Sequence, residues 1–454
     1  MSNMQLVYRV KDKPKFGQLI VFAFQQLLAI LAATIAVPSI VGNGMSQSAA
    51  LFGAGVGTIV YLLFTKFRSP VFLGSSFAFL GSMFAAFGGA ASVSVGYAGL
   101  LIGAALAGLV YVVIATVVKF AGVQWINKLM PAVVIGPTVA IIGLSLAGNA
   151  VGDFLHGAVT DGNGAYVMTA EPLISIVCGL VTLFTVIGCS VYGKKMAKLI
   201  PFIIGILAGY LTATIFTLIG NATGNDALKV IDFSKFSDMK WVPEFSFIEA
   251  FKGFGSIDGT YIASVAVAYV PVAFVVFAEH IADHKNLSSI IGSDLLEDPG
   301  LHRTLLGDGV GSIAGAFFGG CPNTTYGESV GCVAITGIAS VVTILATAVM
   351  AIAISFFAPF VTFLSTIPSC VMGGVCITLY GFIAVSGLKM LQPVDLNKNG
   401  NLFTASVILI AGIGGMTLKF AHVTLTEIAT ALILGIIVNQ VFNREDKKQA
   451  DGEQ

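Results

Sequence analysis

Charge is the scarcest property of this sequence. Only 10% of its 454 residues are Asp, Glu, Lys or Arg, whereas 56% are hydrophobic, and the mean hydropathy is +0.93. Soluble domains carry about a quarter charged residues, so this composition indicates a polytopic membrane protein. The formal net charge is zero, which gives no reason to expect a nucleic-acid partner.

The sequence also lacks the patterns of a disulfide framework, a metal site or a cleaved leader. Its six cysteines all fall in apolar segments, without metal-ligand spacing or the pattern of a secreted domain. We therefore assign them to packing and expect no metal. Residues 1–15 are polar and basic and contain no short apolar stretch closed by a cleavage site, so no cleaved signal peptide is expected. The cysteines are Cys178, Cys189, Cys321, Cys332, Cys370 and Cys376.

Long apolar segments fill most of the chain, and twelve are long enough to cross a bilayer. Stretches 71–89 and 322–337 are too rich in Gly, Ser and Thr to be ordinary spans, and we expect each to be a short strand leading into a half-helix. The prediction is an all-α membrane protein with fourteen crossings and two short antiparallel strands in segments 3 and 10. The twelve ordinary spans are 16–37, 47–65, 95–118, 130–150, 171–192, 199–219, 262–284, 303–320, 339–359, 367–388, 401–418 and 423–443.

The few basic residues gather on one side of these crossings. All but five of the 23 lysines and arginines lie on the side that holds both termini. Four of the exceptions share the long loop 220–256, where the positive-inside rule is weak. We therefore expect cytoplasmic termini, an outer loop at 220–256 and a multi-pass protein of the inner (cytoplasmic) membrane. The exceptions are Lys229, Lys235, Lys240, Lys252 and Lys419.

The two halves of the chain resemble each other as an internal repeat. A Pro-to-Gly stretch at 131–136 recurs at 368–373, and the broken segment at 74–79 has its counterpart at 322–328. Chance similarity of glycine-rich apolar helices is the alternative, but the matching positions of the two broken segments argue against it. An odd number of seven crossings per half makes the second copy inverted, an arrangement in which paired broken helices meet at the midplane.

Four acids stand in or beside apolar segments: Glu279, Asp283, Asp308 and Glu328. Ionisable groups there are costly and indicate function by default. For the first two the alternative stays open that the helix ends there and both acids are interfacial. Glu279 and Asp283 are spaced i, i+4 and share one helical face. Asp308 is flanked by small residues that permit close helix approach, which allows it to hydrogen-bond the backbone of the broken segment.

Two histidines, His280 and His284, are also spaced i, i+4. A metal pair would need a third ligand, and none is suitably spaced, so we interpret them as interfacial residues.

The stretch around Glu328 has the chemistry of a binding site. It follows a turn-like Tyr326-Gly327, so the N–H groups of Gly327 and Glu328 point with the helix dipole toward a ligand acceptor. Phe77, Phe79 and Tyr326 offer flat apolar surface. Because these segments contain no Arg or Lys, an inorganic anion fits poorly. A flat, neutral molecule with alternating N–H and C=O groups fits well.

Several short motifs occur in one order along the chain: 32–34 (AAT), 74–79 (GSSFAF), 278–280 (AEH), 298–303 (DPGLHR), 322–328 (PNTTYGE), 372–375 (MGGV) and 379–381 (LYG). In this order, essentially end to end, the chain resembles the nucleobase/ascorbate transporter family (nucleobase:cation symporter-2), most closely its bacterial uracil permeases. It departs from the family pattern at Ser329, where asparagine is usual, at Asp283, where the best-known uracil permease has histidine, and at Gln26, where histidine is common.

The resemblance implies a core domain (1–120 and 257–360), a gate domain (121–256 and 361–443) and a cytoplasmic tail (444–454). It implies that Glu279 and Glu328 hydrogen-bond a base, that the backbones of Phe77 and Gly327 contribute, and that Ala33, Tyr326 and Tyr380 line the pocket, which Ser329 shapes. It also implies a proton symporter that works as a homodimer through the gate domain.

We therefore expect a proton-coupled importer of uracil or a related pyrimidine in which Glu279, Asp283 and Asp308 serve proton coupling, with sodium as the alternative ion and no cofactor. A purine or xanthine permease is the nearest alternative. Sulfate or bicarbonate exchange on the same architecture is disfavoured by the acids without a pocket cation. A membrane enzyme using paired carboxylates is disfavoured by the missing nucleophile and metal motifs. A passive channel would be excluded by accumulation against a gradient.

Overall fold

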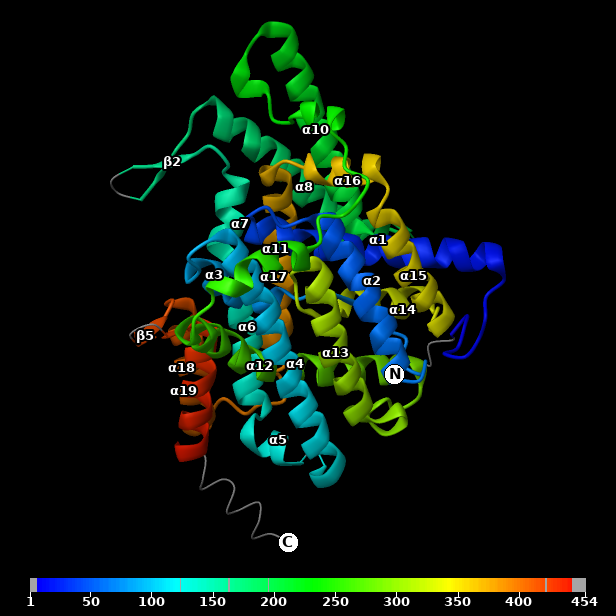
Figure 1. Ribbon diagram of the computed structural model, residues 1–454, viewed down its shortest axis with the longest axis vertical. Helices are drawn as coiled ribbons and strands as arrows, with labels where there is room; N and C mark the ends of the chain where they lie inside the picture. Colours follow the sequence, from blue (N-terminus) through cyan, green and yellow to red (C-terminus); the bar gives the residue numbers. More distant parts are fainter. Residues whose placement is uncertain (1–5, 123, 162–163, 195, 421–422, 443–454) are drawn as a thin grey trace.

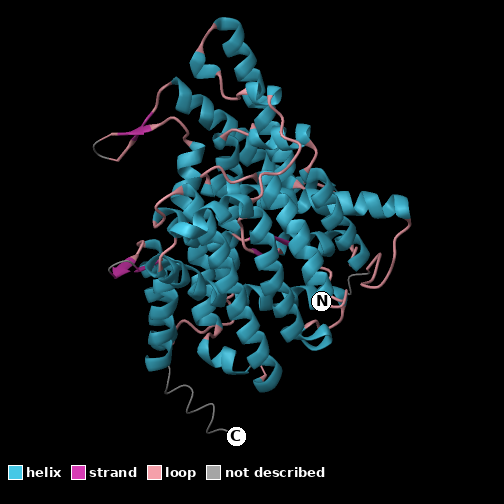
Figure 2. Cartoon of the chain, viewed as in Figure 1, coloured by secondary structure: helices cyan, strands magenta, loops and turns pink. Residues whose placement is uncertain are grey.

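The computed structural model describes residues 6–122, 124–161, 164–194, 196–420 and 423–442. Nearly all regular structure in these ranges is helical (Figure 2). By length and hydropathy, eight spans in these ranges could cross a membrane, and a bent pair, α15 (Val341–Ser355) with α16 (Ala358–Ser365), adds a ninth. The eight are α1 (Phe16–Val41), α2 (Gln47–Phe64), α4 (Val93–Ala121), α6 (Ala132–Ser145) continued by α7 (Ala147–Phe154), α8 (Ala170–Tyr192), α10 (Pro201–Thr223), α12 (Gly259–Ile291) and α17 (Ser369–Lys389). The prediction of a mostly helical membrane protein is confirmed.

The remaining predicted spans are also helices, but they are shorter or less apolar than these. They are α13 (Leu301–Gly319), α18 (Asn399–Ile413) and α19 (Glu427–Phe442). Short helical pieces connect the spans: α5 (Gln124–Leu129), α9 (Met196–Leu199), η2 (Asp226–Leu228), η3 (Phe233–Ser237), α11 (Ser246–Gly253), η4 (Phe254–Ser256) and η5 (Leu296–Gly300). Two hairpins pair β2 (Val159–Thr160) with β3 (Tyr166–Val167) and β5 (Leu418–Phe420) with β6 (Val423–Leu425). Lys195, which entered the charge count, and the predicted tail 444–454 lie outside the described residues.

Both broken segments have the predicted form. Strand β1 (Leu73–Ser75) leads through η1 (Phe77–Phe79) into α3 (Leu80–Gly88), and β4 (Asn323–Thr325) leads into α14 (Gly327–Thr336). The strands pair antiparallel, with Gly74 opposite Thr324. Helix α2 supplies the outer hydrogen bonds of this ribbon, because the Leu73 N–H donates to Thr58 Oγ1 (2.9 Å) and Asn323 Nδ2 donates to the Gly53 carbonyl (3.1 Å). Buried strand edges therefore have partners, as a ribbon away from water requires.

Glycines bring α13 very close to α2. A Cβ at Gly57 would lie 2.7 Å from the Gly311 carbonyl oxygen, and one at Gly319 would lie 2.6 Å from Ala50 Cα. Small residues at such spacings let helix backbones approach within van der Waals distance. This confirms the expectation that small residues around Asp308 allow close packing, since a Cβ at Gly309 would also meet Tyr111.

The helices with the most extensive mutual packing fall into two groups (Figure 1). Around the β1–β4 ribbon, α2 packs on α13 and α15, α13 and α12 pack on α4, and α1 packs on α15. In the other group, α17 packs on α6, α7 and α8, α10 packs on α8, and α18 packs on α6 and α19. Helix α12 reaches across to α19 and β6, so it contacts both groups.

Candidate functional site

The two half-helices begin directly where the paired strands end. Because the strands are antiparallel, α3 and α14 leave the ribbon at opposite ends. The residue before α14, Tyr326, makes no side-chain capping bond, and the backbone N–H of Glu328 bonds its own carboxyl group. Gly327 is exposed although the six residues before it are buried. The first turn of α14 is therefore accessible at Gly327, and we call the accessible region beside this turn the open space.

Glu279 and Asp283 lie on the part of α12 that faces this turn. The Thr325 hydroxyl donates to Asp283 Oδ2 over 3.0 Å, and a Cβ on Gly327 would lie 3.8 Å from Asp283 Oδ1. Glu279 and Glu328 interact electrostatically, and all three acids are partly accessible. Since α12 continues to Ile291, neither acid stands at a helix end. The alternative of an interfacial helix end is therefore wrong.

The predicted aromatic and apolar residues surround the ribbon. Tyr326 packs on Gly74, and its hydroxyl donates to the Ser75 carbonyl (2.8 Å), which orients the ring along β1. Phe77 meets Tyr380 of α17 edge to face, with ring centroids 6.0 Å apart. Ala33 is buried on α1. The structure therefore brings Phe77 of one helix group against Tyr380 of the other.

Ser329 does not reach the open space, and its predicted part in shaping the pocket stays a prediction. Its side chain is 0% exposed, and its Oγ accepts hydrogen bonds from Gln26 Nε2 (2.7 Å) and the Phe72 N–H (3.0 Å). One residue along a helix turns the side chain by about 100°. Ser329 therefore points toward α1 and the start of β1, while Glu328 faces the open space.

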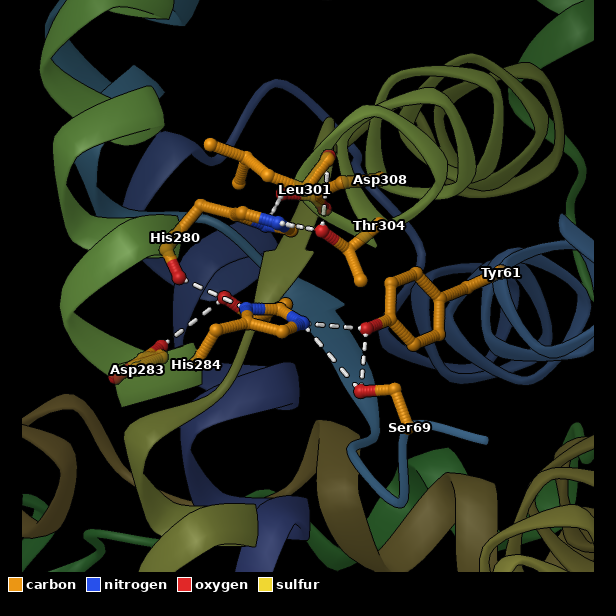
Figure 3. A network of polar contacts seen from close by, with 9 residues as sticks. Tyr61, Ser69, His280, Asp283, His284, Leu301, Thr304 and Asp308 are labelled. Carbon is orange, nitrogen blue, oxygen red and sulfur yellow. Dashed lines mark hydrogen bonds and ion pairs between the residues drawn. The ribbon is translucent and has the colours of Figure 1, made fainter. Parts of the chain in front are cut away.

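The two histidines are buried inside the protein, which the interpretation as interfacial residues did not anticipate. His280 and His284 are 0% and 1% exposed, on the side of α12 that faces α13 and α2 (Figure 3). His280 Nδ1 lies 2.8 Å from Asp308 Oδ2. Asp308 thus bonds His280 and not the backbone of the broken segment. The sequence did not indicate this burial because α12 runs two turns past Asp283, so its inner end is packed in protein.

A cavity of about 320 Å³ adjoins the same region from the side of the second helix group. Of the predicted site residues, only Phe77 belongs to its lining. The one acidic residue in the lining is Glu427, at the first position of α19. The lining residues are Phe77, Leu80, Gly81, Phe84, Ser145, Leu146, Asn149, Glu427 and Ile428. The cavity therefore lies between the half-helix α3 and the helices α6, α7 and α19.

Sequence reasoning missed four residues beside the predicted set. Thr325 bonds Asp283, Gln26 bonds Ser329, His280 bonds Asp308, and Glu427 lines the cavity. The i, i+4 pair His280 and His284 beside the acidic pair was an available signal. Glu427 could also have been found, because it is an acidic residue at the start of the last apolar segment. Within the described ranges, no group of three or more His, Cys, Asp or Glu side chains could hold a metal ion.

The fold defines the class of protein. The structure superposes on the transmembrane domain of a cyanobacterium bicarbonate transporter, BicA, with a TM-score of 0.63 at 16% sequence identity, covering 95% of this chain and 100% of that one. At this identity the likeness shows the fold alone, which is that of a membrane transporter.

The sequence then gives the family. Residues 17–420 match the Xan_ur_permease family model, described as Permease family, and the chain belongs to this family. It is 41% identical to the uracil permease of Bacillus caldolyticus over 96% of this chain and 94% of that protein. It is 37% identical to the uracil permease of Bacillus subtilis (strain 168) over 99% of this chain and 98% of that protein. The predicted resemblance is confirmed, and the chain is a transporter and not an enzyme.

Proposed function

We propose that this permease imports uracil or a closely related pyrimidine base. The observation that carries the proposal is the meeting of three carboxyl groups, Glu279, Asp283 and Glu328, with the first turn of α14. Carboxylates accept hydrogen bonds from ring N–H groups, and the N–H groups of Gly327 and Glu328 donate to ring carbonyls. The names of the relatives, both uracil permeases, support the same substrate.

Aromatic surface completes the proposed site. In this proposal Phe77 and Tyr326 flank the plane of the base, Ala33 limits its depth, and Tyr380 closes it from the gate side. The backbones of Phe77 and Gly327 contribute hydrogen bonds. Ser329 acts indirectly, through the placement of α14, since its own side chain is buried.

Transport in this proposal is coupled to protons, with Glu279, Asp283 and Asp308 as the coupling acids. A carboxylate crossing in a low-dielectric interior is costly, and protonation removes that cost. The substrate site then alternates between the two sides as the core domain (1–120 and 257–360) moves against the gate domain (121–256 and 361–443). The two packing groups of helices support this division.

We also propose the finer topology of the sequence-based prediction: fourteen crossings as two inverted halves, cytoplasmic termini, the inner membrane, and a homodimer formed through the gate domain. The antiparallel strands with half-helices leaving opposite ends support the inverted halves. A purine or xanthine permease is the alternative of the same family. A further alternative is an anion exchanger on the fold shared with BicA, but the three acids of the proposed site disfavour an anionic substrate.

A thermal-shift panel of bases tests the substrate. Uracil, thymine, xanthine, hypoxanthine and uric acid are added separately to the detergent-purified protein and to the Glu328→Ala variant. We expect uracil to raise the melting temperature of the wild type and to lose this effect in the variant. Glu297→Ala, which removes an exposed acid far from α14 in sequence, is the matched control and should keep the effect. Stabilisation by purines alone, or by no base, would contradict the proposal.

A further inference from the structure

The polar network on the back of α12 connects α12 with α2 and α13, and Figure 3 draws it together with Asp283 of the proposed substrate site. Helix α12 turns Glu279 and Asp283 toward the open space and His280 and His284 toward α13 and α2. Every ring nitrogen of the two histidines has a partner. The proton positions can therefore be derived from what each partner is able to donate or accept.

For His284 only one arrangement is possible while the ring is neutral. Its Nδ1 lies 2.8 Å from the His280 carbonyl oxygen, and a carbonyl can only accept, so Nδ1 carries the hydrogen. Nε2 lies 2.6 Å from the Tyr61 hydroxyl, which donates to Ser69 Oγ (2.7 Å). His284 is thus a fixed link between α12 and the inner end of α2.

His280 has two arrangements with the same heavy-atom positions. The Thr304 hydroxyl lies 3.0 Å from both His280 Nε2 and the Leu301 carbonyl, and it has one hydrogen to give. In the first arrangement it donates to Nε2, and Nδ1–H donates to the Asp308 carboxylate. In the second it donates to Leu301, Nε2 carries an added proton and donates to the Thr304 oxygen, and Nδ1–H is unchanged. One proton is gained, the contact between His280 Nε2 and Thr304 keeps a donor and an acceptor, and the Thr304–Leu301 hydrogen bond is made only in the second arrangement.

The added proton also changes the buried charge. His280 and Asp308 are both 0% exposed, and Asp308 Oδ1 has no hydrogen-bond partner among the described residues. Without the proton the pair buries one negative charge, and with it the pair is neutral overall, which burial favours. The nearest other titratable group is His284, whose ring stacks on that of His280 with centroids 4.0 Å apart. The others are Glu279 and Asp283 of α12, Tyr61 of α2 and Tyr111 of α4, with Glu328 of α14 across the open space.

From this geometry we infer that His280 and Asp308 together hold a transported proton, and that His280 is a coupling residue of this permease. The inference rests on the proposed proton symport and adds to it a proton-holding pair behind the cavity acids. His280 does not touch the substrate, so it acts on coupling and not on base recognition. His284, of the same residue type and burial, has no such role because its partners are Tyr61, Ser69 and the His280 carbonyl, so no buried carboxylate would balance an added proton.

The test compares His280→Asn with His284→Gln in proteoliposomes. His280→Asn keeps a donor for Asp308 but cannot take up a proton. We expect it to lose uracil accumulation driven by a pH gradient while it keeps uracil counterflow, the exchange of labelled for unlabelled base that needs no net proton movement. His284→Gln should keep gradient-driven accumulation, even where its melting temperature falls.

The outcomes separate this inference from the proposed function. Wild-type protein that shows no gradient-driven accumulation refutes proton symport itself. A coupled wild type with an equally coupled His280→Asn refutes the inference alone, as does equal loss of coupling in His284→Gln. His280→Gln, which reaches the Nε2 position, replaces His280→Asn where that variant does not fold. The infrared difference between the wild type and His280→Asn, both with ring-labelled histidine, should show an imidazolium band on acidification, and its absence would also refute the inference.

Discussion

At Ser329 a single hydroxyl joins three parts of the chain. Its oxygen accepts from Gln26 Nε2 of α1 and from the Phe72 N–H before β1, and all three groups are buried. Ser329→Ala removes the acceptor of the Phe72 N–H and leaves Gln26 Nε2 only its 3.4 Å contact with the backbone carbonyl of residue 329, at a cost of about 1–3 kcal/mol for each lost bond. We predict a clear fall in melting temperature with an unchanged order of affinity among bases, measured by the thermal-shift panel. A changed order of affinity would show that Ser329 contacts the base after all.

Gln26 provides the control for this bond. In Gln26→Leu the amide donor is already gone, so adding Ser329→Ala should cost less than it does in the wild type, since contacting residues are not additive. Fully additive losses of melting temperature in the double variant would contradict the contact between Gln26 and Ser329.

The sequence indicates which residues belong to the site more reliably than it indicates where their side chains point. Glu279 and Glu328 stand out because acids are rare in apolar segments, and the structure places both beside the same open space. Ser329 is the next residue to Glu328 but turns away from that space, because the strand β4 sets the rotation of α14. That rotation depends on a partner strand about 250 residues away, and local sequence does not encode it.

At the level of elements, the β1–β4 ribbon fixes the start of both half-helices. Gly74 is central to it, because a Cβ there would overlap the Tyr326 ring. We predict that Gly74→Ala displaces Tyr326, costs about 1–3 kcal/mol by overpacking and abolishes uracil stabilisation in the thermal-shift assay. Gly331→Ala in α14 is the matched control, since its Cβ meets nothing within 4 Å. Normal uracil binding in Gly74→Ala would contradict the role of the ribbon.

The elements themselves were largely predictable. Composition marked 71–89 and 322–337 as broken, and each contains a strand and a half-helix. The end of α12 was not predictable from hydropathy, because Lys285 and Asn286 mimic a loop although the helix continues to Ile291. Burial of its polar inner end against α13 and α2 is a tertiary effect, which explains why the burial of His280 and His284 was not predicted.

At the level of the whole molecule, transport in this account requires the two helix groups to move past each other. The cavity between α3 and α19 is one place where they meet, and a Cβ on Gly81 would lie 3.8 Å from Glu427 Oε1. We predict that joining Gly81→Cys to Glu427→Cys with a short bifunctional thiol reagent stops uracil uptake. The single variants treated with the same reagent are the controls. Undiminished uptake by the cross-linked protein would contradict movement at this boundary.

The most direct test of the account is uptake of labelled uracil into proteoliposomes under an imposed pH gradient, acidic outside. We predict accumulation above the external concentration, abolished by a protonophore, and uptake by Glu279→Gln that no longer responds to the gradient. Uptake that reaches only the external concentration, whatever the gradient, would contradict proton-coupled import by this permease.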